Sequence, residues 1–288
     1  MGAIITLTTD FGSSDAYVAT MKGVILSINP EATLVDICHA IKPQNIAQAA
    51  FVLSTAYEFF PERSIHVVVV DPGVGTDRRA IILRTPTADF IAPDNGVLSY
   101  LIQDFYQPPL SPLSPPPLQT TPDEQPRQAK LTPEFKAIAI TKPQFWRSPV
   151  NSTFHGRDIF APVAAHLSLG SPTEDFGEAI TSLEILEPPQ PCNSPDGTLV
   201  GQVIHIDNFG NLITNIKDDN LPGTKQAITI EINEHTIHGL SHTYTEGKGL
   251  LALIGSSGYL EISLKEGNAS TFLDAGVGYG VNIKRSPS

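Results

Sequence analysis

Three stretches of the chain place ionisable residues at the expected end of a strand or just before an expected helix. Asp10 follows "ITLTT", Asp71 follows four consecutive valines, and His155 stands in "NSTFHGRD". Asp71 opens the turn "DPGVGTDRR", which also contains Arg78 and Arg79. A turn needs only the Pro and Gly of that stretch, and each polar residue could be a simple cap or an ion pair. Carboxylates and an imidazole that converge on one crevice would instead be the groups of acid–base chemistry.

An α/β domain would position these residues. We expect a Rossmann-like N-terminal domain with a mostly parallel sheet and flanking helices, because strand and helix patterns alternate along it. In such sheets ligands bind beyond the carboxyl ends of the strands, where Asp10 and Asp71 fall. The first helix should have Ser13 or Ser14 as its cap and end at Pro30. The expected strands cover residues 3–8, 32–37, 64–70, 79–84, 89–94 and 136–141, and the expected helices cover 13–30, 45–60, 95–105 and 156–170.

A proline-rich segment interrupts this domain. Residues 107–133 contain nine prolines and almost no periodic apolar residues. The composition predicts an insertion loop with polyproline character. It could be a ligand for a proline-reading domain, but a tolerated surface insertion is the simpler interpretation.

The C-terminal part has a different sequence pattern from the N-terminal part. Short β runs separated by turns follow one another after "EPPQPCNSP". We therefore predict an α/β domain over residues 1–190, with the insertion at about 107–133, and a smaller all-β barrel or sandwich domain over residues 191–288.

Composition excludes several classes of partner. The chain has 288 residues and a net charge of −12. No basic run is present, so a nucleic-acid partner is not expected. The apolar runs are strand-sized, so no membrane span is expected. Cys38 and Cys192 are the two cysteines; they provide neither a disulfide framework nor a metal site, and a reducing cytoplasm fits them.

Two stretches of the second domain have polar residues suited to binding. "HIDNFGNLITNI" carries Asp207, Phe209 and Asn211 at the end of a predicted strand. An aromatic ring can face a planar base, and an amide can read an amide-like edge. "GSSG" at residues 255–258 could form a nest of donors for a carboxylate. Each stretch is also compatible with an ordinary β-turn.

Several motifs, in order, resemble one family. "LTTDFG" with "MKG", "VVDPGVGT", "APDNG", "FHGRDIFAP", "IDNFGN" with "TNI", and "SSGYLEI" are similar to the adenosine-forming S-adenosyl-L-methionine (SAM) hydrolases, the SAM hydroxide adenosyltransferases, which are related to the fluorinase and chlorinase. The resemblance runs from residue 4 to about residue 284, apart from the insertion. It implies hydrolysis of SAM to adenosine and L-methionine, with no cofactor and no metal. It also implies a homotrimer whose active site lies between neighbouring subunits.

The resemblance assigns the catalytic residues. The family's Asp, Arg and His around the attacking water match Asp71, Arg78 and His155, whereas Arg79 falls outside the family's spacing. The halogenating relatives have a tyrosine where this chain has Asp71. A carboxylate repels halide and can orient water. His155 is the candidate to take the proton, because an imidazole titrates near neutral pH.

The resemblance also assigns substrate contacts. Asp10 would bind the ribose hydroxyls, Asp207 the ammonium of the methionine part, and Ser256 its carboxylate. Asn211 would contact the nucleoside, and Asn268 and Ala269 match a loop that contacts adenine mainly through backbone atoms. Phe209, by its residue type alone, is the further candidate to face the base. Two alternatives remain: a non-catalytic SAM or nucleoside-binding protein, which would not need the three catalytic groups, and a SAM-dependent halogenase.

Overall fold

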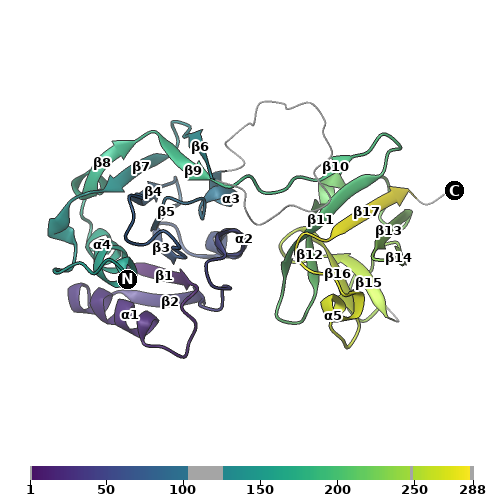
Figure 1. Ribbon diagram of the computed structural model, residues 1–288, viewed down its shortest axis with the longest axis horizontal. Helices are drawn as coiled ribbons and strands as arrows, with labels where there is room; N and C mark the ends of the chain where they lie inside the picture. The colour runs from purple at the N-terminus through teal and green to yellow at the C-terminus, as the bar shows by residue number, and fades with distance from the viewer. Residues whose placement is uncertain (1, 103–125, 247–248, 286–288) are drawn as a thin grey trace. The chain divides into compact units, whose positions relative to one another are not determined.

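The structure is a computed structural model and describes residues 2–102, 126–246 and 249–285 (Figure 1). Two compact units make up the chain. The described residues up to Pro188 form an α/β unit, and those from Pro189 onward form a β unit.

A seven-stranded sheet runs through the α/β unit in the order β2-β1-β3-β5-β4-β7-β8. The pairs β1–β2, β1–β3 and β3–β5 are parallel, and β4–β5, β4–β7 and β7–β8 are antiparallel. The predicted α/β class is confirmed, but the sheet is mixed rather than mostly parallel. The short link between β4 and β5 is the reason, because it allows only an antiparallel hairpin. The strands are β1 (Ile4–Thr9), β2 (Thr33–Cys38), β3 (Ser64–Val69), β4 (Ala80–Arg84), β5 (Ala88–Pro93), β7 (Lys136–Ile140) and β8 (Gly177–Ile180).

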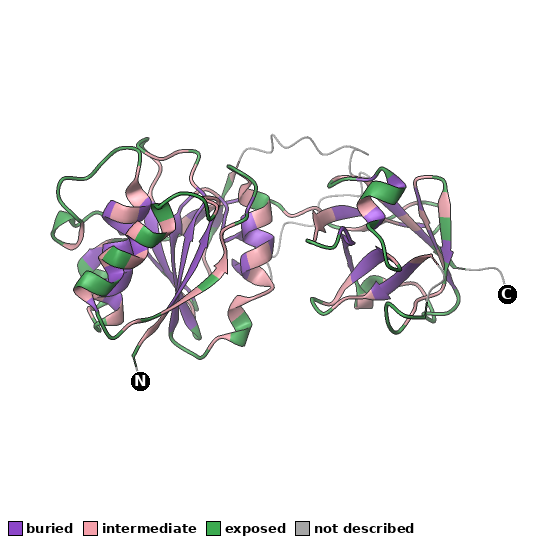
Figure 2. Ribbon diagram, turned by 90° about the horizontal axis from the view of Figure 1, so that it is seen from below, coloured by how far each residue is buried: buried purple, intermediate pink, exposed green. Residues whose placement is uncertain are grey.

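Helices cover both faces of this sheet (Figure 2). α1 and α4 pack over one hydrophobic cluster, and α2 and α3 over another. β3 and β5 in the middle of the sheet are buried along their whole length, as expected for strands with both faces covered, whereas β2 and β8 at its edges are partly exposed. The helical segments are α1 (Tyr17–Ile28), α2 (Ile46–Ser54), α3 (Ser99–Ile102), α4 (Ala161–Ser168), the π-helical turn η4 (Gly156–Phe160), and the short 3₁₀ turns η1 (Tyr57–Phe59), η3 (Pro143–Phe145) and η5 (Thr173–Phe176).

The start of α1 differs from the prediction. Neither Ser13 nor Ser14 caps it, because the N-cap is Ala16, which makes no side-chain cap bond. Gly12 turns the chain first, with φ +68° and its N–H donating to the carbonyl of His39 at 2.8 Å. This turn places the two serines before the helix.

Part of the predicted insertion is a strand. Residues 126–133 lie within the described part of the chain, and β6 (Arg127–Lys130) pairs there with β9 (Ser182–Ile185). Ala129 is buried in this pair. Its neighbours in "RQAK" are exposed, so the segment lacked the apolar alternation by which a strand is predicted. The rest of the expected insertion, residues 107–125, lies outside the described residues.

The β unit is a nearly closed antiparallel barrel. Its strand order is β14-β13-β17-β11-β12-β16-β15, with β10 on β11. The N–H of Ser241, just after β14, donates to the carbonyl of Ala252 in β15 at 2.8 Å, which joins the two ends of the sheet. The predicted all-β class is confirmed. The elements are β10 (Cys192–Asn193), β11 (Leu199–Ile206), β12 (Leu212–Lys217), η6 (Asp218–Asn220), β13 (Ile228–Ile232), β14 (His235–His238), β15 (Leu250–Ile254), β16 (Tyr259–Leu264), α5 (Ala269–Leu273) and β17 (Gly280–Arg285).

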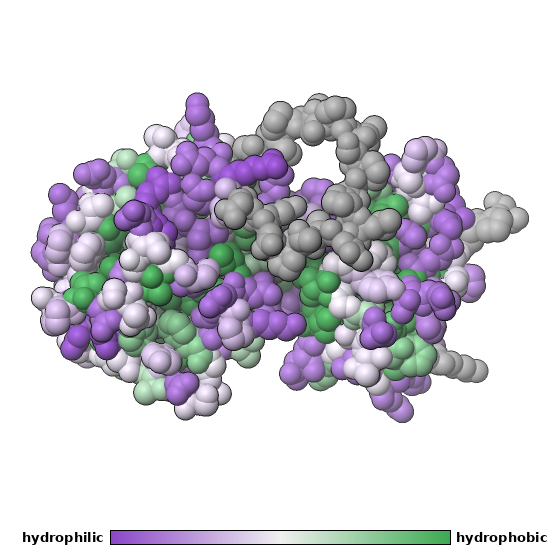
Figure 3. Space-filling view, in the orientation of Figure 1, coloured by the Kyte–Doolittle hydropathy of each residue, from purple (hydrophilic) through white to green (hydrophobic). Residues whose placement is uncertain are grey.

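The surface has the mixed character of a globular domain. On the visible face of the α/β unit, hydrophobic residues are scattered among hydrophilic ones (Figure 3). Within the described ranges, no helix has the length and apolar character to cross a membrane.

Candidate active site

Two predicted site residues lie at the same edge of the sheet. β1 and β3 are parallel neighbours, and Thr9 at the end of β1 pairs with Val69 at the end of β3. Asp10 follows the first strand directly, and Asp71 begins the turn after the second. The carboxyl ends of adjacent parallel strands therefore bring the two carboxylates to one edge, as the sequence predicted.

Asp71, Arg78 and His155 form one connected group. Nε of Arg78 donates to Asp71 Oδ1 at 2.9 Å, and Nη2 donates to Asp71 Oδ2. The same Nη2 lies 2.8 Å from Nδ1 of His155. The side chain of Asp71 is 5% exposed and that of Arg78 is 11% exposed. A bidentate carboxylate thus fixes the guanidinium, which in turn contacts the imidazole.

The turn that carries Arg78 packs tightly against the segment before His155. Gly75 has φ +79°, and a Cβ at this position would lie 2.5 Å from the carbonyl oxygen of Ser152. Only glycine satisfies both the left-handed backbone and the close approach. Gly75 therefore brings the "DPGVGTDR" turn and the "FHGRD" stretch together.

The contact with Arg78 assigns the tautomer of His155. A guanidinium has donors and no acceptor, so Nδ1 of the imidazole must accept, and the neutral ring carries its proton on Nε2. Burial lowers the pKa of His155, and the positive charge of Arg78 lowers it further, against the opposing charges of Asp71 and Asp158. The imidazole is therefore neutral at neutral pH, with its one lone pair already used.

Arg79 has a separate structural role. Its Nε donates to Asp94 Oδ2 at 2.8 Å, and its Nη2 donates to the carbonyl of Ser182 at 3.1 Å. Asp94 also accepts from the N–H of Glu184. Arg79 thus ties β5 to β9, and the two adjacent arginines serve different parts of the unit.

Asp10 is half-buried and held by a neighbouring loop. Its Oδ2 accepts from the N–H of Gln44 at 2.7 Å. Thr9 Oγ1 lies 2.8 Å from Nδ1 of His39, in the connection between β2 and α2. These contacts fix the end of β1 against that connection, while Oδ1 of Asp10 accepts no hydrogen bond from the described residues.

An aromatic pocket adjoins these residues and was missed at the sequence level. Phe11 follows Asp10, Phe154 precedes His155, and both rings pack with Tyr17. The pocket has a volume of about 380 Å³. Its remaining lining residues are Asn151, Thr153 and Arg157. The available signal was the position of each phenylalanine directly beside a polar site residue.

In the β unit, four predicted binding residues lie together. Asp207 Oδ1 accepts from the N–H groups of Phe209 and Asn211, and Oδ2 accepts from the Asn211 amide at 2.8 Å. Gly210 packs on Asn268, since a Cβ there would lie 2.1 Å from the Asn268 amide carbon. Phe209 is 75% exposed. Hydrogen bonds to Asp207 thus stabilise the loop between β11 and β12, and the ring of Phe209 is exposed on it.

Ala269 and Ser256 complete the predicted set. Ala269 is buried at the start of α5, directly after Asn268, which caps that helix. Ser256 is exposed on the turn between β15 and β16. The backbone N–H groups of Ser256 and Ser257 donate to none of the described residues, so this turn offers two donors to an anion.

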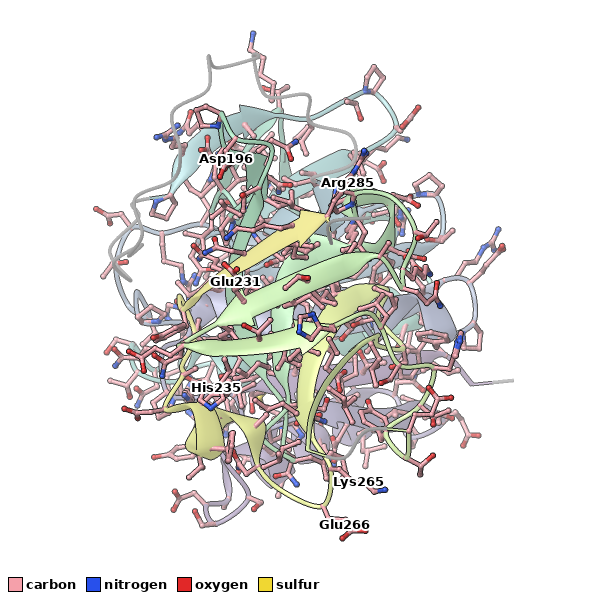
Figure 4. All side chains as sticks on the ribbon, turned by 90° about the vertical axis from the view of Figure 1, so that its right-hand side faces the viewer. Asp196, Glu231, His235, Lys265, Glu266 and Arg285 are labelled. Atoms are coloured by element: carbon pink, nitrogen blue, oxygen red, sulfur yellow. The ribbon has the colours of Figure 1, made fainter. Side chains whose placement is uncertain are left out.

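A larger hollow in the β unit contains no predicted site residue. It measures about 740 Å³ and lies beside the β13–β14 hairpin, where Figure 4 shows Glu231 and His235. Volume alone does not make it the functional site, because none of the motif residues lines it. Among the described residues, no group of three or more His, Cys, Asp or Glu is arranged to hold a metal ion.

Comparison with known proteins identifies the family. Residues 5–111 and 125–177 match the SAM hydroxide adenosyltransferase N-terminal domain, and residues 201–282 match the SAM hydroxide adenosyltransferase C-terminal domain. The match omits residues 112–124, which belong to the proline-rich segment. The chain belongs to the SAM hydroxide adenosyltransferase family, as its motifs predicted.

Relatives of two kinds match nearly the whole chain. The (R)-S-adenosyl-L-methionine hydrolase of Methanocaldococcus jannaschii is 34% identical and covers 94% of this chain and 92% of its own. The hydrolase of the same name from Thermus thermophilus is 33% identical, and the match covers 96% of this chain and 97% of the relative. The fluorinase of Actinopolyspora mzabensis is 26% identical, and the match covers 98% of this chain and 97% of the relative. The crystal structure of an uncharacterized conserved protein from Thermotoga maritima has a TM-score of 0.82 and 32% identity, over 98% and 100%.

Proposed function

We propose that this protein hydrolyses S-adenosyl-L-methionine to adenosine and L-methionine. Water attacks C5′ of the ribose, the bond from C5′ to the sulfonium sulfur breaks, and methionine leaves with the bonding electron pair as a neutral thioether. One proton of the water is released to the solvent, so that the sulfonium cation and water give two neutral thioether and alcohol groups and one proton. Because the leaving group becomes neutral, catalysis needs no acid on that side, and no cofactor enters the reaction.

The observation that carries this proposal is the connected group of Asp71, Arg78 and His155. Nη1 of Arg78 and Nε2 of His155 donate to none of the residues that the structure describes. Two such donors can hold an oxygen and stabilise the negative charge that develops as the proton leaves. Asp71 orients Arg78 and balances its charge.

The remaining predicted residues bind the substrate in this proposal. The free oxygen of Asp10 accepts from the ribose hydroxyls. The donors at Ser256 hold the carboxylate of the amino acid part, and Phe209, Asn211, Asn268 and Ala269 form the nucleoside contacts. Asp207 supports them by ordering the loop between β11 and β12.

Because a fluorinase is among the relatives, halide transfer to SAM is the main alternative reaction. The carboxylate of Asp71 disfavours a halide ion as the nucleophile, because a buried carboxylate repels a nearby anion. The connected group of Asp71, Arg78 and His155 also argues that the protein does more than bind SAM, because binding alone does not require residues that position a water.

Product analysis tests the proposal. The purified protein is incubated with SAM, with and without chloride or fluoride, and the products are separated by chromatography. We expect adenosine and methionine in equal amounts, unchanged by halide. A halogenated nucleoside would indicate the halogenase, and unchanged SAM would indicate a binding protein.

We also propose a homotrimer in which catalytic residues of one subunit and binding residues of its neighbour act on one substrate. The supporting observation is their division: the connected group belongs to the α/β unit and the 207–211 loop to the β unit. Light scattering should give three times the monomer mass. A fully active monomer would contradict the proposal.

A further inference from the structure

The guanidinium of Arg78 has an aromatic neighbour that has no part in the function proposed above. Its Cζ lies over the ring of Phe160, 5.4 Å from the ring centroid. A cation within about 6 Å of an aromatic face is attracted by the negative potential of the ring. Phe160 is fully buried and the side chain of Arg78 is nearly so, and water therefore screens this attraction little.

The other contacts of this guanidinium all use its N–H groups. Asp71 accepts from Nε and Nη2 of Arg78, and Nδ1 of His155 accepts from the same Nη2. These bonds hold one edge of the group and leave Nη1 at the other edge. Phe160 contacts the cation without accepting a classical hydrogen bond, so it stabilises the guanidinium and leaves Nη1 available.

The π-helical turn η4 brings His155 and Phe160 to the same cation. His155 directly precedes the turn, Phe160 is its last residue, and the N–H of Ala161 donates to the carbonyl of Gly156, five residues earlier. In an α-helix, residues five apart point about 140° away from each other around the axis. The wider turn brings two such residues closer to one side, and turns of this kind are frequent at functional sites.

The turn is anchored independently of Arg78. Asp158, in the middle of the turn, is fully buried. Its carboxylate accepts from Nε of Arg157 at 2.7 Å and from the N–H of Asn151 at 2.9 Å. The ring of Phe160 also belongs to the core beneath α1 and α4. Phe160 is therefore a fixed surface against which the guanidinium packs.

We propose that Phe160 is a positioning residue for Arg78, whose ring holds the guanidinium so that Nη1 is directed at the oxygen of the attacking water. The inference rests on the proposed function, in which Nη1 of Arg78 and Nε2 of His155 hold that oxygen. An aromatic ring suits this role because it attracts the cation and competes for none of its donors. Since Phe160 is fully buried, it acts through Arg78.

Fluorinated phenylalanines at position 160 test the attraction. One, two or three fluorine atoms on the ring weaken its negative face step by step, while the shape of the side chain changes little. We expect kcat of SAM hydrolysis to fall with each added fluorine, by about threefold to tenfold in total. KM should stay within about twofold of wild type, because the contact matters most when charge develops on the water oxygen.

Phe176 provides the matched control. It is also fully buried in the same hydrophobic cluster, and its ring packs on Phe145, with no described Lys or Arg over it. The same fluorinated residues at position 176 should leave kcat unchanged. Phe160→Leu and Phe176→Leu should lower the melting temperature by similar amounts, because each removes a ring from the core, but only Phe160→Leu should lower kcat.

A second measurement does not depend on turnover. Burial and the positive charge of Arg78 lower the pKa of His155. When the attraction to Phe160 is weakened, the guanidinium can move away from the imidazole. The pKa of His155, followed by NMR, should then rise towards its ordinary value in the variants fluorinated at position 160. The variants fluorinated at position 176 should keep the wild-type pKa.

The outcomes separate the two proposals. A wild type that forms no adenosine from SAM refutes the proposed function. A wild type that hydrolyses SAM, with variants fluorinated at position 160 that keep both kcat and the pKa of His155, overturns the role of Phe160 alone. Equal losses of kcat at positions 160 and 176 would also overturn it, because the effect would then come from the packing of the core.

Discussion

At the scale of single residues, the contact between Arg78 and His155 decides how each can act. The lone pair of the imidazole accepts from Arg78, and its proton lies on Nε2. The interpretation from sequence had His155 take the proton of the water. The geometry instead favours a donor that holds the oxygen, together with Nη1 of Arg78.

Two substitutions of His155 separate these roles. His155→Gln offers an amide N–H near the position of Nε2, whereas His155→Asn keeps only an acceptor for Arg78 near the position of Nδ1. If the imidazole is a donor, kcat of the Gln variant should stay within about tenfold of wild type. The Asn variant should lose about a hundredfold or more. An equally deep loss in both variants would point to a proton acceptor instead.

The pH dependence of kcat should show an acid limb. Activity needs the neutral imidazole, because protonation of Nδ1 breaks the bond from Arg78 and places two cations side by side. The pKa of His155 is lowered by burial and by Arg78, so activity should fall only below pH 6.5 and should level off above it. The charge of Asp71 opposes this shift. Asp71→Asn should therefore lower kcat and shift the acid limb of the pH profile to lower pH. An acid limb at the same pH in this variant would show that a group other than His155 titrates there.

The site residues were predictable from sequence to different degrees. Asp71, Arg78 and His155 stand in contiguous motifs, and the structure connects all three. The packing of Phe11 and Phe154 on Tyr17 was not predicted, because it depends on how the segment after β1 lies against the segment before η4. No local pattern records such a contact between segments that are far apart in the sequence.

At the scale of elements, the turn after β3 brings Arg78 into contact with His155. Gly75 allows this turn to lie against Ser152, three residues before His155 in the chain. A larger residue would push the turn, and Arg78 with it, away from the imidazole.

Gly75→Ala should therefore lower kcat by about tenfold or more, since small displacements of catalytic groups are costly. Gly170→Ala is the matched control, because Gly170 also has a positive φ, of +90°, but a Cβ there meets nothing within 4 Å. Both variants should lose about 1 kcal/mol of stability from the strained backbone. Steady-state kinetics beside thermal melting make the comparison, and equal activity of the two variants would refute the role of the close approach.

The sequence predicted most elements of both units but not how they pair. The valine run of β3 and the ends of β1 and β3 followed from hydrophobic patterns. The antiparallel edge formed by β4, β7 and β8 did not, because strand direction depends on connections rather than on the composition of each strand. β6 was missed for the related reason that only Ala129 of its four residues is buried.

At the scale of the whole molecule, most of the proline-rich segment lies outside the ranges that match the family's two domains. The family match omits residues 112–124 and resumes at residue 125, just before β6. The family model therefore does not describe this segment, and we predict that the two domains do not depend on it.

Replacing residues 112–124 with a short Gly/Ser linker should leave the melting temperature and the turnover rate unchanged. Extending the replacement to residue 130 should lower the melting temperature, because it removes β6 and the buried Ala129. Differential scanning calorimetry and the SAM assay check both variants. A large loss with the shorter replacement would show that the segment contributes to folding or catalysis.

In the proposed reaction water is the nucleophile that attacks C5′ of the ribose, and an isotope experiment identifies this nucleophile. The protein is incubated with SAM in water enriched in the heavy oxygen isotope, with chloride present, and the adenosine is analysed by mass spectrometry. We expect the heavy isotope in the 5′-hydroxyl of adenosine, which forms together with methionine. Adenosine without the label, or a halogenated nucleoside in its place, would contradict it.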